Sequence, residues 1–337
     1  MNNATIIGEI YPVVYAKTGL WSFDRALGFR GEIGVPLRSL FELYGHEHSG
    51  KSTLAWFIAA SIGSGGKIWI ADLEGTLDKK YIKNVVENAG YSGEVEIVRY
   101  IAKKKKKGKD VMRSHEAQLQ EVIDALLDPE TQASVVDSIG SFVPILEADQ
   151  DLGEVAWGKR AKVIASASRR ILSHLRIAED PKLIFFINHV HPRMGAGKGY
   201  DTPGGETKKY AANIRVWLQR IDNKVPEGSG NFLAEARIQK LKVGGTNTKR
   251  KGLIYFIPGY GVSREMTAVF DCVGVEIARR AASVELLEYD NKKGEDVWVK
   301  MGRLSALAEK AEEPEKNRAL FKHFTDALER YDDANAE

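Results

Sequence analysis

Short apolar runs alternate with longer stretches of helical periodicity through the first part of the chain. The runs are nearly continuous in apolar residues, which is typical of strands buried on both faces of a parallel sheet. We expect such strands in SLFELYG, KIWIADLE, EVEIVRY, ASVVDS and KLIFFINHV. The helical stretches between them are Ser52–Ile62, Lys79–Asn88, His115–Leu127 and Gly158–Ile177. This alternation predicts an α/β fold with a doubly wound, mostly parallel sheet.

After Tyr210 the pattern changes to closely spaced strands joined by turns rich in Gly, Asn and Lys. NIRVWLQRI, EARIQKLKV and GLIYFIP are expected to form an antiparallel extension of the same sheet. From about Met266 the pattern is helical and mixed, and Glu312–Tyr331 is expected to be a charged terminal helix. The expected parts are an N-terminal arm (1–17, with strand-like Thr5–Tyr15), a core (18–265), and a small C-terminal α+β domain with a tail (266–337).

Composition adds limits rather than a function. Of the 337 residues 43 % are hydrophobic and 28 % charged, as in a soluble rather than a disordered protein, and the net charge of +3 neither requires nor excludes nucleic acid. A single cysteine, Cys272, excludes an internal disulfide framework and a cysteine zinc cluster and suits a reducing cytoplasm. The start lacks the layout of a signal peptide, and no apolar run is long enough for a transmembrane helix. We therefore expect a cytoplasmic protein without a membrane partner.

One basic run, Lys103–Lys109 (KKKKKGK), stands out within this balanced composition. A solvated loop between a strand and a helix would explain it. Non-specific contact with phosphate is the alternative.

A phosphate-binding motif follows the first apolar strand. GHEHSGKS matches G-x-x-x-x-G-K-[ST] in full, between a strand and a helix. Glycines let the loop direct its N–H groups at phosphate oxygens, and the helix adds its positive end. Lys51 would supply charge to the β- and γ-phosphates and Ser52 a hydroxyl to Mg²⁺, whereas His46 and His48 occupy variable positions and are simplest as loop filler. The expected nucleotide-binding residues here are Gly45, His46, Glu47, His48, Ser49, Gly50, Lys51, Ser52 and Thr53.

Two carboxylates end buried strands downstream of this motif. Asp137 closes ASVVDS and is expected to hold Mg²⁺ through water. Glu74 closes KIWIADLE, at the sheet edge where α/β folds bind ligands. Because hydrolysis needs a group that orients or deprotonates the attacking water, Glu74 is the candidate base. A helix-capping or surface carboxylate is the alternative for Glu74.

Several segments resemble RecA-type recombinases in their order and spacing. They are Thr18-Gly19, Leu27-Gly28, GHEHSGKSTL, DLEGTLDKKY, VVDSIGSFVP, FFINHV and GGETKKYAANIR, and the resemblance spans about Thr18 to Leu328. Several details favour the phage UvsX-like branch. The resemblance implies a RecA-type P-loop NTPase core that binds ATP and Mg²⁺, in a bacterial cell or in the host of a phage.

The resemblance also implies roles around the nucleotide, carried over position by position. Glu74 corresponds to the catalytic glutamate. Asp78 and Tyr81 fall where the family contacts and stacks on adenine, although core packing would also explain the tyrosine. Asn188-His189 stands where many members have Asn-Gln as the γ-phosphate sensor. His189 departs from that pattern, but an imidazole can still donate one hydrogen bond to phosphate.

Two DNA-binding loops are implied after the strands that end at Asp137 and Asn188. They would cover about residues 147–157 and 190–207. The second is glycine-rich and suits contact with single strands, and a mobile surface loop is the alternative. The DNA-binding residues expected in these loops are Trp157, Arg193, Met194, Lys198, Tyr200, Gly204 and Gly205.

Two further sets of basic residues follow a regular spacing. Lys162, Arg169 and Arg176 are seven residues apart, so they share one helix face that would track a phosphate backbone; a solvated face is the alternative. Lys162 and Arg169 also match DNA-binding positions of the family. Lys240 and Lys242 alternate on a strand and project from one side. By resemblance they reach the ATP of a neighbouring protomer; without it they would protect a sheet edge.

The expected function is ATP-dependent homologous recombination, with a helical filament of this protein on single-stranded DNA. Homologous duplex DNA is then the second partner, and loader, mediator and single-strand-binding proteins are further ones. Two alternatives stay open at this point. One is a hexameric helicase or DNA motor of the same fold, and the other is a nucleotide-binding mediator without strand exchange. A mediator would be expected to lack Glu74, Lys240 and Lys242.

Overall fold

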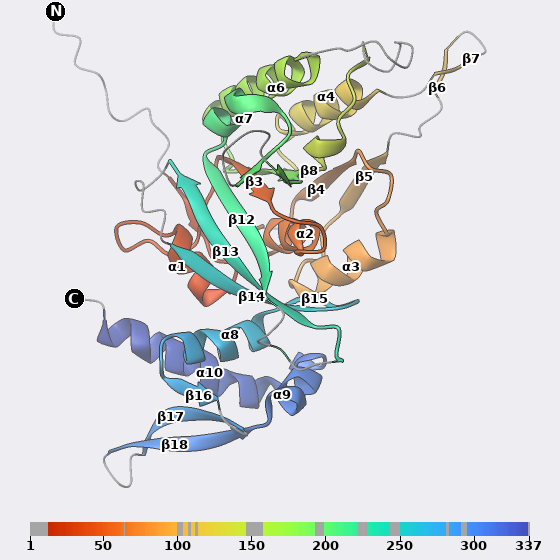
Figure 1. The fold of residues 1–337 in the computed structure, drawn as a ribbon. Coiled ribbons are helices and arrows are strands. Elements are labelled where there is room, and N and C mark those ends of the chain that lie inside the picture. Colours follow the sequence, from red (N-terminus) through yellow and green to blue (C-terminus); the bar gives the residue numbers. More distant parts are fainter. Residues whose placement is uncertain are drawn as a thin grey trace, which may run out of the picture.

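A computed structural model describes the chain from residue 13 to residue 335 with gaps (Figure 1). The described residues are 13–63, 65–99, 104–106, 109–111, 114–145, 158–192, 199–221, 225, 228–242, 250–280, 283–290 and 295–335. Most of the predicted strand Thr5–Tyr15 and the first predicted DNA loop, 147–157, therefore lie outside the described residues.

One large sheet organises the described chain. Its order is β15-β14-β13-β12-β3-β9-β8-β4-β5, and the pairs from β12 to β5 are parallel. The strands are β3 (Ser39–Tyr44), β4 (Lys67–Asp72), β5 (Val95–Arg99), β8 (Thr131–Asp137), β9 (Leu183–Asn188), β12 (Ile214–Ile221), β13 (Phe232–Leu241), β14 (Lys251–Ile257) and β15 (Gly261–Ser263). The predicted α/β fold with a mostly parallel sheet is thus confirmed.

The predicted antiparallel extension is confirmed, and its first strand also joins the parallel part of the sheet. β12 pairs parallel with β3, with Ile214 opposite Phe41, and antiparallel pairing begins only between β12 and β13. The reason is that the connection from β9 to β12 contains a helix, α7 (Gly205–Ala211). This connection brings the chain back to the edge where β3 begins, so β12 runs in the same direction as β3, as a crossover connection requires.

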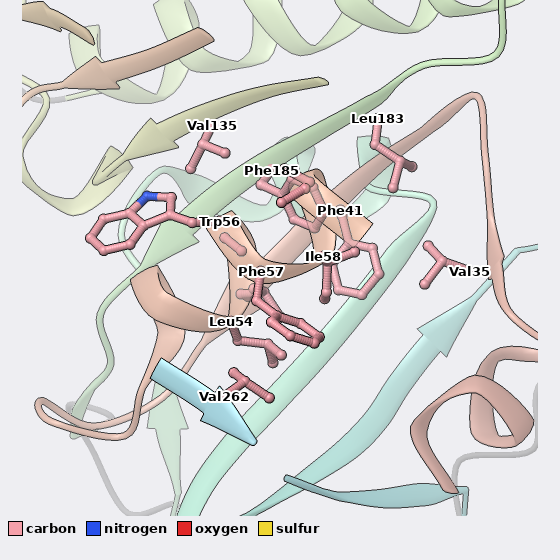
Figure 2. Packing of buried hydrophobic residues seen from close by; sticks show 14 of the residues in the cluster. Val35, Phe41, Leu54, Trp56, Phe57, Ile58, Val135, Leu183, Phe185 and Val262 are labelled. Carbon is pink, nitrogen blue, oxygen red and sulfur yellow. The ribbon is translucent and has the colours of Figure 1, made fainter. Parts of the chain in front are cut away.

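Helices cover both faces of the sheet, so it is doubly wound. On one face α2 (Lys51–Ser61) and α3 (Lys79–Asn88) bury apolar side chains, and Figure 2 shows Leu54 and Phe57 of α2 packed with Phe41 and Phe185 of the sheet. On the other face Leu40 and Ile184 lie in a second cluster with residues of α4 (His115–Ala125) and α6 (Lys159–Ile177). Neighbouring residues of one strand thus enter opposite clusters, as the two-residue repeat of a strand dictates.

The C-terminal part forms a third cluster against the end of the sheet. Its elements are α8 (Arg264–Gly274), β16 (Ala278–Arg280), β17 (Val284–Asp290), β18 (Glu295–Gly302), α9 (Leu304–Ala311) and α10 (Pro314–Ala334). Leu233 and Tyr255 of the sheet share this cluster with Phe324 of α10. Near the chain start, α1 (Trp21–Leu27) follows a short pair, β1 (Tyr15–Ala16) with β2 (Val35–Pro36). Trp21 donates its Nε1–H to Asp332 of α10 at 2.9 Å, so α1 and α10 are in contact.

Short elements complete the fold. The loop expected at Lys103–Lys109 contains a small antiparallel pair instead, β6 (Lys104–Lys106) with β7 (Lys109–Val111). β10 (His191–Pro192) pairs with β11 (Tyr200–Asp201), and η2 (Ile139–Ser141) follows β8. None of the helices within the described ranges is long and apolar enough to cross a membrane.

Candidate active site

The phosphate-binding loop lies between β3 and α2 and depends on two glycines. A Cβ at Gly45 would lie 2.2 Å from the backbone oxygen of Leu218 in β12, so only glycine fits there. Gly50 has φ 87°, a left-handed conformation that glycine adopts without strain, and it is the N-cap of α2. The loop borders a cavity of about 750 Å³ whose lining includes Lys51, Glu74, Asp137 and His189. The structure therefore brings the predicted nucleotide and catalytic residues together.

Lys51 is buried beneath this loop. Its Nζ donates a hydrogen bond to the backbone oxygen of His46 at 2.6 Å. Burial lowers the pKa of Lys51, while the nearby carboxylates of Asp137, Glu74 and Glu47 act to raise it. A phosphate is a stronger acceptor for an ammonium group than a neutral carbonyl. A triphosphate in the cavity would therefore compete with His46 for Lys51.

Asp137 and Ser52 have the chemistry of a magnesium site. Asp137 is 4 % exposed, and its Oδ2 is a buried oxygen with no hydrogen-bond partner among the described residues. Burial raises the pKa of Asp137 to about 7, and a hydrogen bond from Ser52 opposes that rise. A buried, incompletely bonded carboxylate beside a hydroxyl suits a hard cation, which prefers oxygen ligands. The residues present therefore fit the Mg²⁺ that the motif predicts.

Glu74, which follows β4, is held by groups that follow the two neighbouring strands β8 and β9. Its Oε1 accepts hydrogen bonds from Ser138 at 2.5 Å and Ser141 at 3.1 Å, both after β8. Nε2 of His189, after β9, lies 2.9 Å from the same oxygen. The bond to His189 is the largest cause that lowers the pKa of Glu74, to about 2, and both serines contribute. This carboxylate is thus ionised and oriented, as a group that positions water must be.

Ser138 and Ser141 are absent from the sequence-based prediction. Both stand in VVDSIGSF, directly after the strand that ends at Asp137. Their signal in the sequence was two hydroxyls next to a predicted metal carboxylate.

Asp72, which lies close to Glu74 in the sequence, shapes the turn that carries Glu74. It is 0 % exposed and accepts the backbone N–H of Gly75 at 2.7 Å.

Tyr81 and Asp78 have structural contacts of their own. Asp78 is the N-cap of α3 and accepts the backbone N–H groups of Lys80 and Tyr81. Oη of Tyr81 lies 2.9 Å from Oγ1 of Thr53, and its ring meets Trp56 edge-on with centroids 5.9 Å apart. Tyr81 therefore lies against the helix that follows the phosphate-binding loop. The adenine-binding role stays a prediction for both residues.

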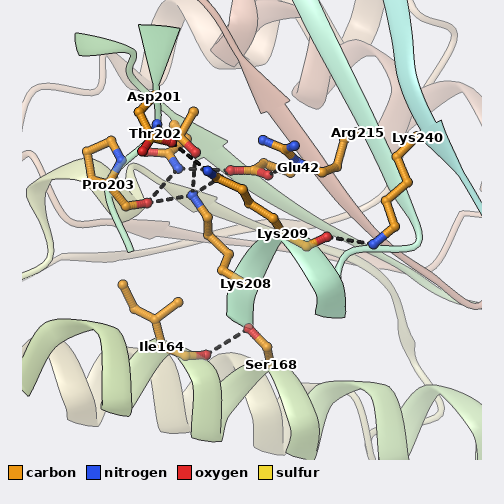
Figure 3. Close-up of polar contacts among 11 residues, drawn as sticks. Glu42, Ile164, Ser168, Asp201, Thr202, Pro203, Lys208, Lys209, Arg215 and Lys240 are labelled. Atoms are coloured by element: carbon orange, nitrogen blue, oxygen red, sulfur yellow. Dashed lines mark hydrogen bonds and ion pairs between the residues drawn. The ribbon is translucent and has the colours of Figure 1, made fainter. Parts of the chain in front are cut away.

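A buried ionic network connects the end of β9 to the end of the second predicted DNA loop (Figure 3). Glu42 of β3 is 0 % exposed and pairs with Lys208 of α7 at 2.7 Å and with Arg215 of β12 at 2.6 Å. Asn188 donates to Glu42 at 2.9 Å and to the backbone oxygen of Pro203 at 3.1 Å. Lys208 and Arg215 hold the pKa of Glu42 below its usual value even though burial acts to raise it. The glutamate within SLFELYG, a polar residue in an apolar run, was the available signal for this network.

Lys240 and Lys242 both reach the C-terminal end of α7. Nζ of Lys240 donates to the backbone oxygens of Lys209 at 2.6 Å and Tyr210 at 2.9 Å, and Nζ of Lys242 to that of Ala211 at 3.4 Å. Burial lowers the pKa of Lys240 to about 8, and Lys242 adds to that effect. Lys240 and Lys242 therefore cap the C-terminal end of α7, and they also bring two positive charges close together.

The predicted DNA-binding residues are only partly within the described ranges. Trp157, Arg193, Met194 and Lys198 lie outside them. Gly204 has φ 99° and is the N-cap of α7, Gly205 is the first residue of that helix, and Tyr200 is 47 % exposed. Lys162, Arg169 and Arg176 are all exposed on α6. The described basic face of α6 is therefore accessible, and its contact with DNA stays a prediction.

The comparisons with known proteins agree on one family. The family model described as the RecA N-terminal domain matches residues 9–262. Protein RecA of Heliobacterium modesticaldum is 26 % identical over 285 residues, which are 83 % of this chain and 75 % of that protein. Protein RecA of Synechocystis sp. is 29 % identical over 233 residues, 67 % of this chain and 60 % of that protein. Protein RecA of Nitratiruptor sp. is 28 % identical over 314 residues, 91 % of this chain and 82 % of that protein. The match covers the phosphate-binding loop, Glu74, Asp137 and His189, and the chain belongs to the RecA family as a RecA-like recombination protein.

Proposed function

We propose that this protein is a DNA-dependent ATPase that forms helical filaments on single-stranded DNA and promotes homologous pairing and strand exchange. The observation that supports it most is the convergence of Ser138, Ser141 and His189 on Oε1 of Glu74, at the edge of the cavity bordered by the phosphate-binding loop. A carboxylate held in this way is suited to orient a water molecule for attack on a phosphate.

In this proposal the residues in and around the cavity have distinct tasks. The backbone of the phosphate-binding loop and Lys51 bind the triphosphate, and Asp78 and Tyr81 contact adenine. Glu74 orients and deprotonates the attacking water, while His189 positions Glu74 and donates to phosphate. Ser52 and Asp137 would hold Mg²⁺, which supplies positive charge to the phosphates when bound.

The filament provides the remaining groups. Lys240 and Lys242 extend the positive charge of one protomer to the ATP of the next, so ATP closes the interface between them. ATP then favours the DNA-binding arrangement to the extent that it binds that arrangement more tightly. Lys162 and Arg169 contact the phosphate backbone, and Trp157, Arg193, Met194, Lys198, Tyr200, Gly204 and Gly205 serve as loop contacts. Residues 1–17 join neighbouring protomers. Homologous duplex DNA is the second substrate, and loader and single-strand-binding proteins are proposed partners.

A strand-exchange assay with ATP, combined with electron micrographs of the same mixture, tests this function. We expect exchange between a single strand and a homologous duplex, together with open helical filaments. Closed rings and strand unwinding would instead indicate a helicase, because translocation around DNA needs a closed ring. Nucleotide binding without filaments or exchange would indicate a mediator.

A further inference from the structure

Four aromatic side chains form a ring cluster between the phosphate-binding loop and the second predicted DNA loop. His46 belongs to the phosphate-binding loop and Tyr200 to β11, while Tyr44 and Trp217 come from the adjacent strands β3 and β12. All four line a cavity of about 630 Å³. His46 stands at a variable position of the phosphate-binding motif, so the motif itself does not account for its part in this ring cluster.

His46 makes two edge-on ring contacts. Its centroid lies 4.6 Å from that of Tyr200 with the planes at 90°, and 5.8 Å from that of Trp217 at 87°. Tyr200 and Trp217 are 5.6 Å apart. Edge-to-face pairs at these distances are attractive because the positive edge of one ring meets the negative face of another. The ring of His46 is therefore coupled to the position of Tyr200.

The same residue is tied to the phosphate-binding lysine through its backbone. The oxygen of His46 accepts hydrogen bonds from Nζ of Lys51 at 2.6 Å and from Oγ of Ser49 at 2.8 Å. A triphosphate that takes Lys51 removes the charge-assisted one of these two bonds. The backbone of His46 is thus sensitive to phosphate, while its side chain touches Tyr200.

The other side of the ring cluster is fixed. Trp217 meets Tyr44 edge-on at 5.5 Å, and the guanidinium of Arg215 lies 4.6 Å from the centroid of Tyr44. Arg215 is itself paired with the fully buried Glu42. By contrast, His46 is exposed and Tyr200 is 47 % exposed. A movement of His46 will therefore be transmitted to Tyr200 more readily than to the anchored rings.

On the basis of the proposed function, we propose that His46 is a positioning residue that couples phosphate binding at Lys51 to the C-terminal end of the second DNA loop, through its ring contact with Tyr200. The coupling is reciprocal, because a ligand at either site must change the affinity for the other by the same factor. Single-stranded DNA that orders Tyr200 thereby also favours the loop geometry that binds phosphate.

The test measures affinity for a non-hydrolysable ATP analogue with and without an oligo(dT) strand, and the ratio of the two affinities is the coupling factor. We expect His46→Ala and Tyr200→Ala each to lower this factor by about two- to tenfold, the range of an aromatic pair. The double variant should lower it no further, because both changes remove the same contact. His46→Phe and Tyr200→Phe, which keep the rings, should retain the coupling.

A second readout follows the ring cluster directly. The analogue should change the fluorescence of Trp217, obtained as the difference between the protein and its Trp217→Phe variant, and this change should disappear in His46→Ala. His323→Ala is the control, since it removes an exposed histidine of α10 that lines neither cavity and should keep the coupling factor. An unchanged coupling factor in His46→Ala, or additive losses in the double variant, would overturn the inference. A wild-type protein that binds the analogue but no oligonucleotide would instead contradict the proposed function itself.

Discussion

Nε2 of His189 lies 2.9 Å from Oε1 of Glu74, so the residue at the predicted γ-phosphate sensor position contacts the predicted catalytic base. An imidazole that moves toward a phosphate would have to release this oxygen or share its contact. The predicted sensing role of His189 and the predicted catalytic role of Glu74 would thereby be linked by a single hydrogen bond.

Glu74→Gln is expected to retain ATP binding and to slow hydrolysis by at least about a hundredfold, the usual scale for loss of a general base. Because ATP would persist, filaments on DNA should also last longer. Phosphate release and filament lifetime measure the two effects. Glu87→Gln, at an exposed carboxylate of α3, is the control and should leave turnover unchanged. Normal turnover in Glu74→Gln would place the base elsewhere.

Replacement of Lys162 and Arg169 by Ala should weaken binding to single-stranded DNA and make it less dependent on salt. Each phosphate contact contributes roughly 0.7 to the log–log salt slope on single strands, so the slope should fall by about one unit or more. Binding isotherms at several salt concentrations give this slope. Replacement of Lys316 and Lys322, two exposed lysines of α10, is the control. An unaltered salt slope would indicate that this face of α6 is a solvated surface without contact to DNA.

The pair Lys240 and Lys242 tests the interface between protomers. The double Ala variant should bind nucleotide through its own phosphate-binding loop and lose DNA-stimulated hydrolysis, because the neighbouring site loses two positive charges. Lys51→Ala should be inactive because its own phosphate-binding loop lacks the lysine, although its Lys240 and Lys242 are intact. Mixing the two inactive proteins creates interfaces with one full set of groups, so some ATPase activity should return. Mixed filaments without activity would show that the lysines do not act across the interface.

The burial of Asp271 leads us to expect that the free energy of unfolding depends on pH. It is 2 % exposed, its Oδ1 has no hydrogen-bond partner within the described part of the chain, and burial raises its pKa from 3.8 to about 7. The folded protein therefore binds more protons than the unfolded chain between these values, and the contribution of Asp271 to stability falls as pH rises through that window.

Asp271→Asn should therefore become more stable relative to the wild type as pH rises from about 4 to about 7, by a few kcal/mol in total, since one pKa unit corresponds to about 1.4 kcal/mol. The amide keeps an acceptor for the backbone N–H of Ser22, which donates to Asp271 at 3.1 Å. Urea unfolding at several pH values measures the difference. The exposed Asp180→Asn should change the free energy of unfolding by less than about 0.5 kcal/mol. A constant difference between Asp271→Asn and wild type would contradict the prediction.

The sequence predicted the parallel strands and the residues at their carboxyl ends, because the phosphate-binding motif and the apolar runs are local signals. Glu74 and Asp137 could be proposed because each closes such a run. Ser138 and Ser141 could not be distinguished from ordinary loop hydroxyls without knowing that β4 and β8 are neighbours. The parallel pairing of β12 depends on where α7 returns the chain, which periodicity does not contain.

Contacts between distant segments were beyond the reach of a local pattern. His46 was interpreted as loop filler, yet its ring meets Tyr200 and Trp217 from segments far along the chain. Glu42 stood in an apolar run without any sign that Lys208 and Arg215 would neutralise it. Such pairs arise from the strand order, and a buried carboxylate stays ionised only where the fold supplies its partners.

The contact between Trp21 and Asp332 joins residues that are 311 positions apart. During synthesis, α1 and the sheet residues Leu233 and Tyr255 leave the ribosome well before α10, which supplies Phe324 to their shared cluster. Part of the apolar surface of the core therefore stays uncovered until α10 has been translated, because a chain is synthesised from the N-terminus at a limited rate. The sequence of the core is thus complete in a nascent chain before its apolar surface is buried, so the end of its sheet is expected to stay uncovered until α10 is made.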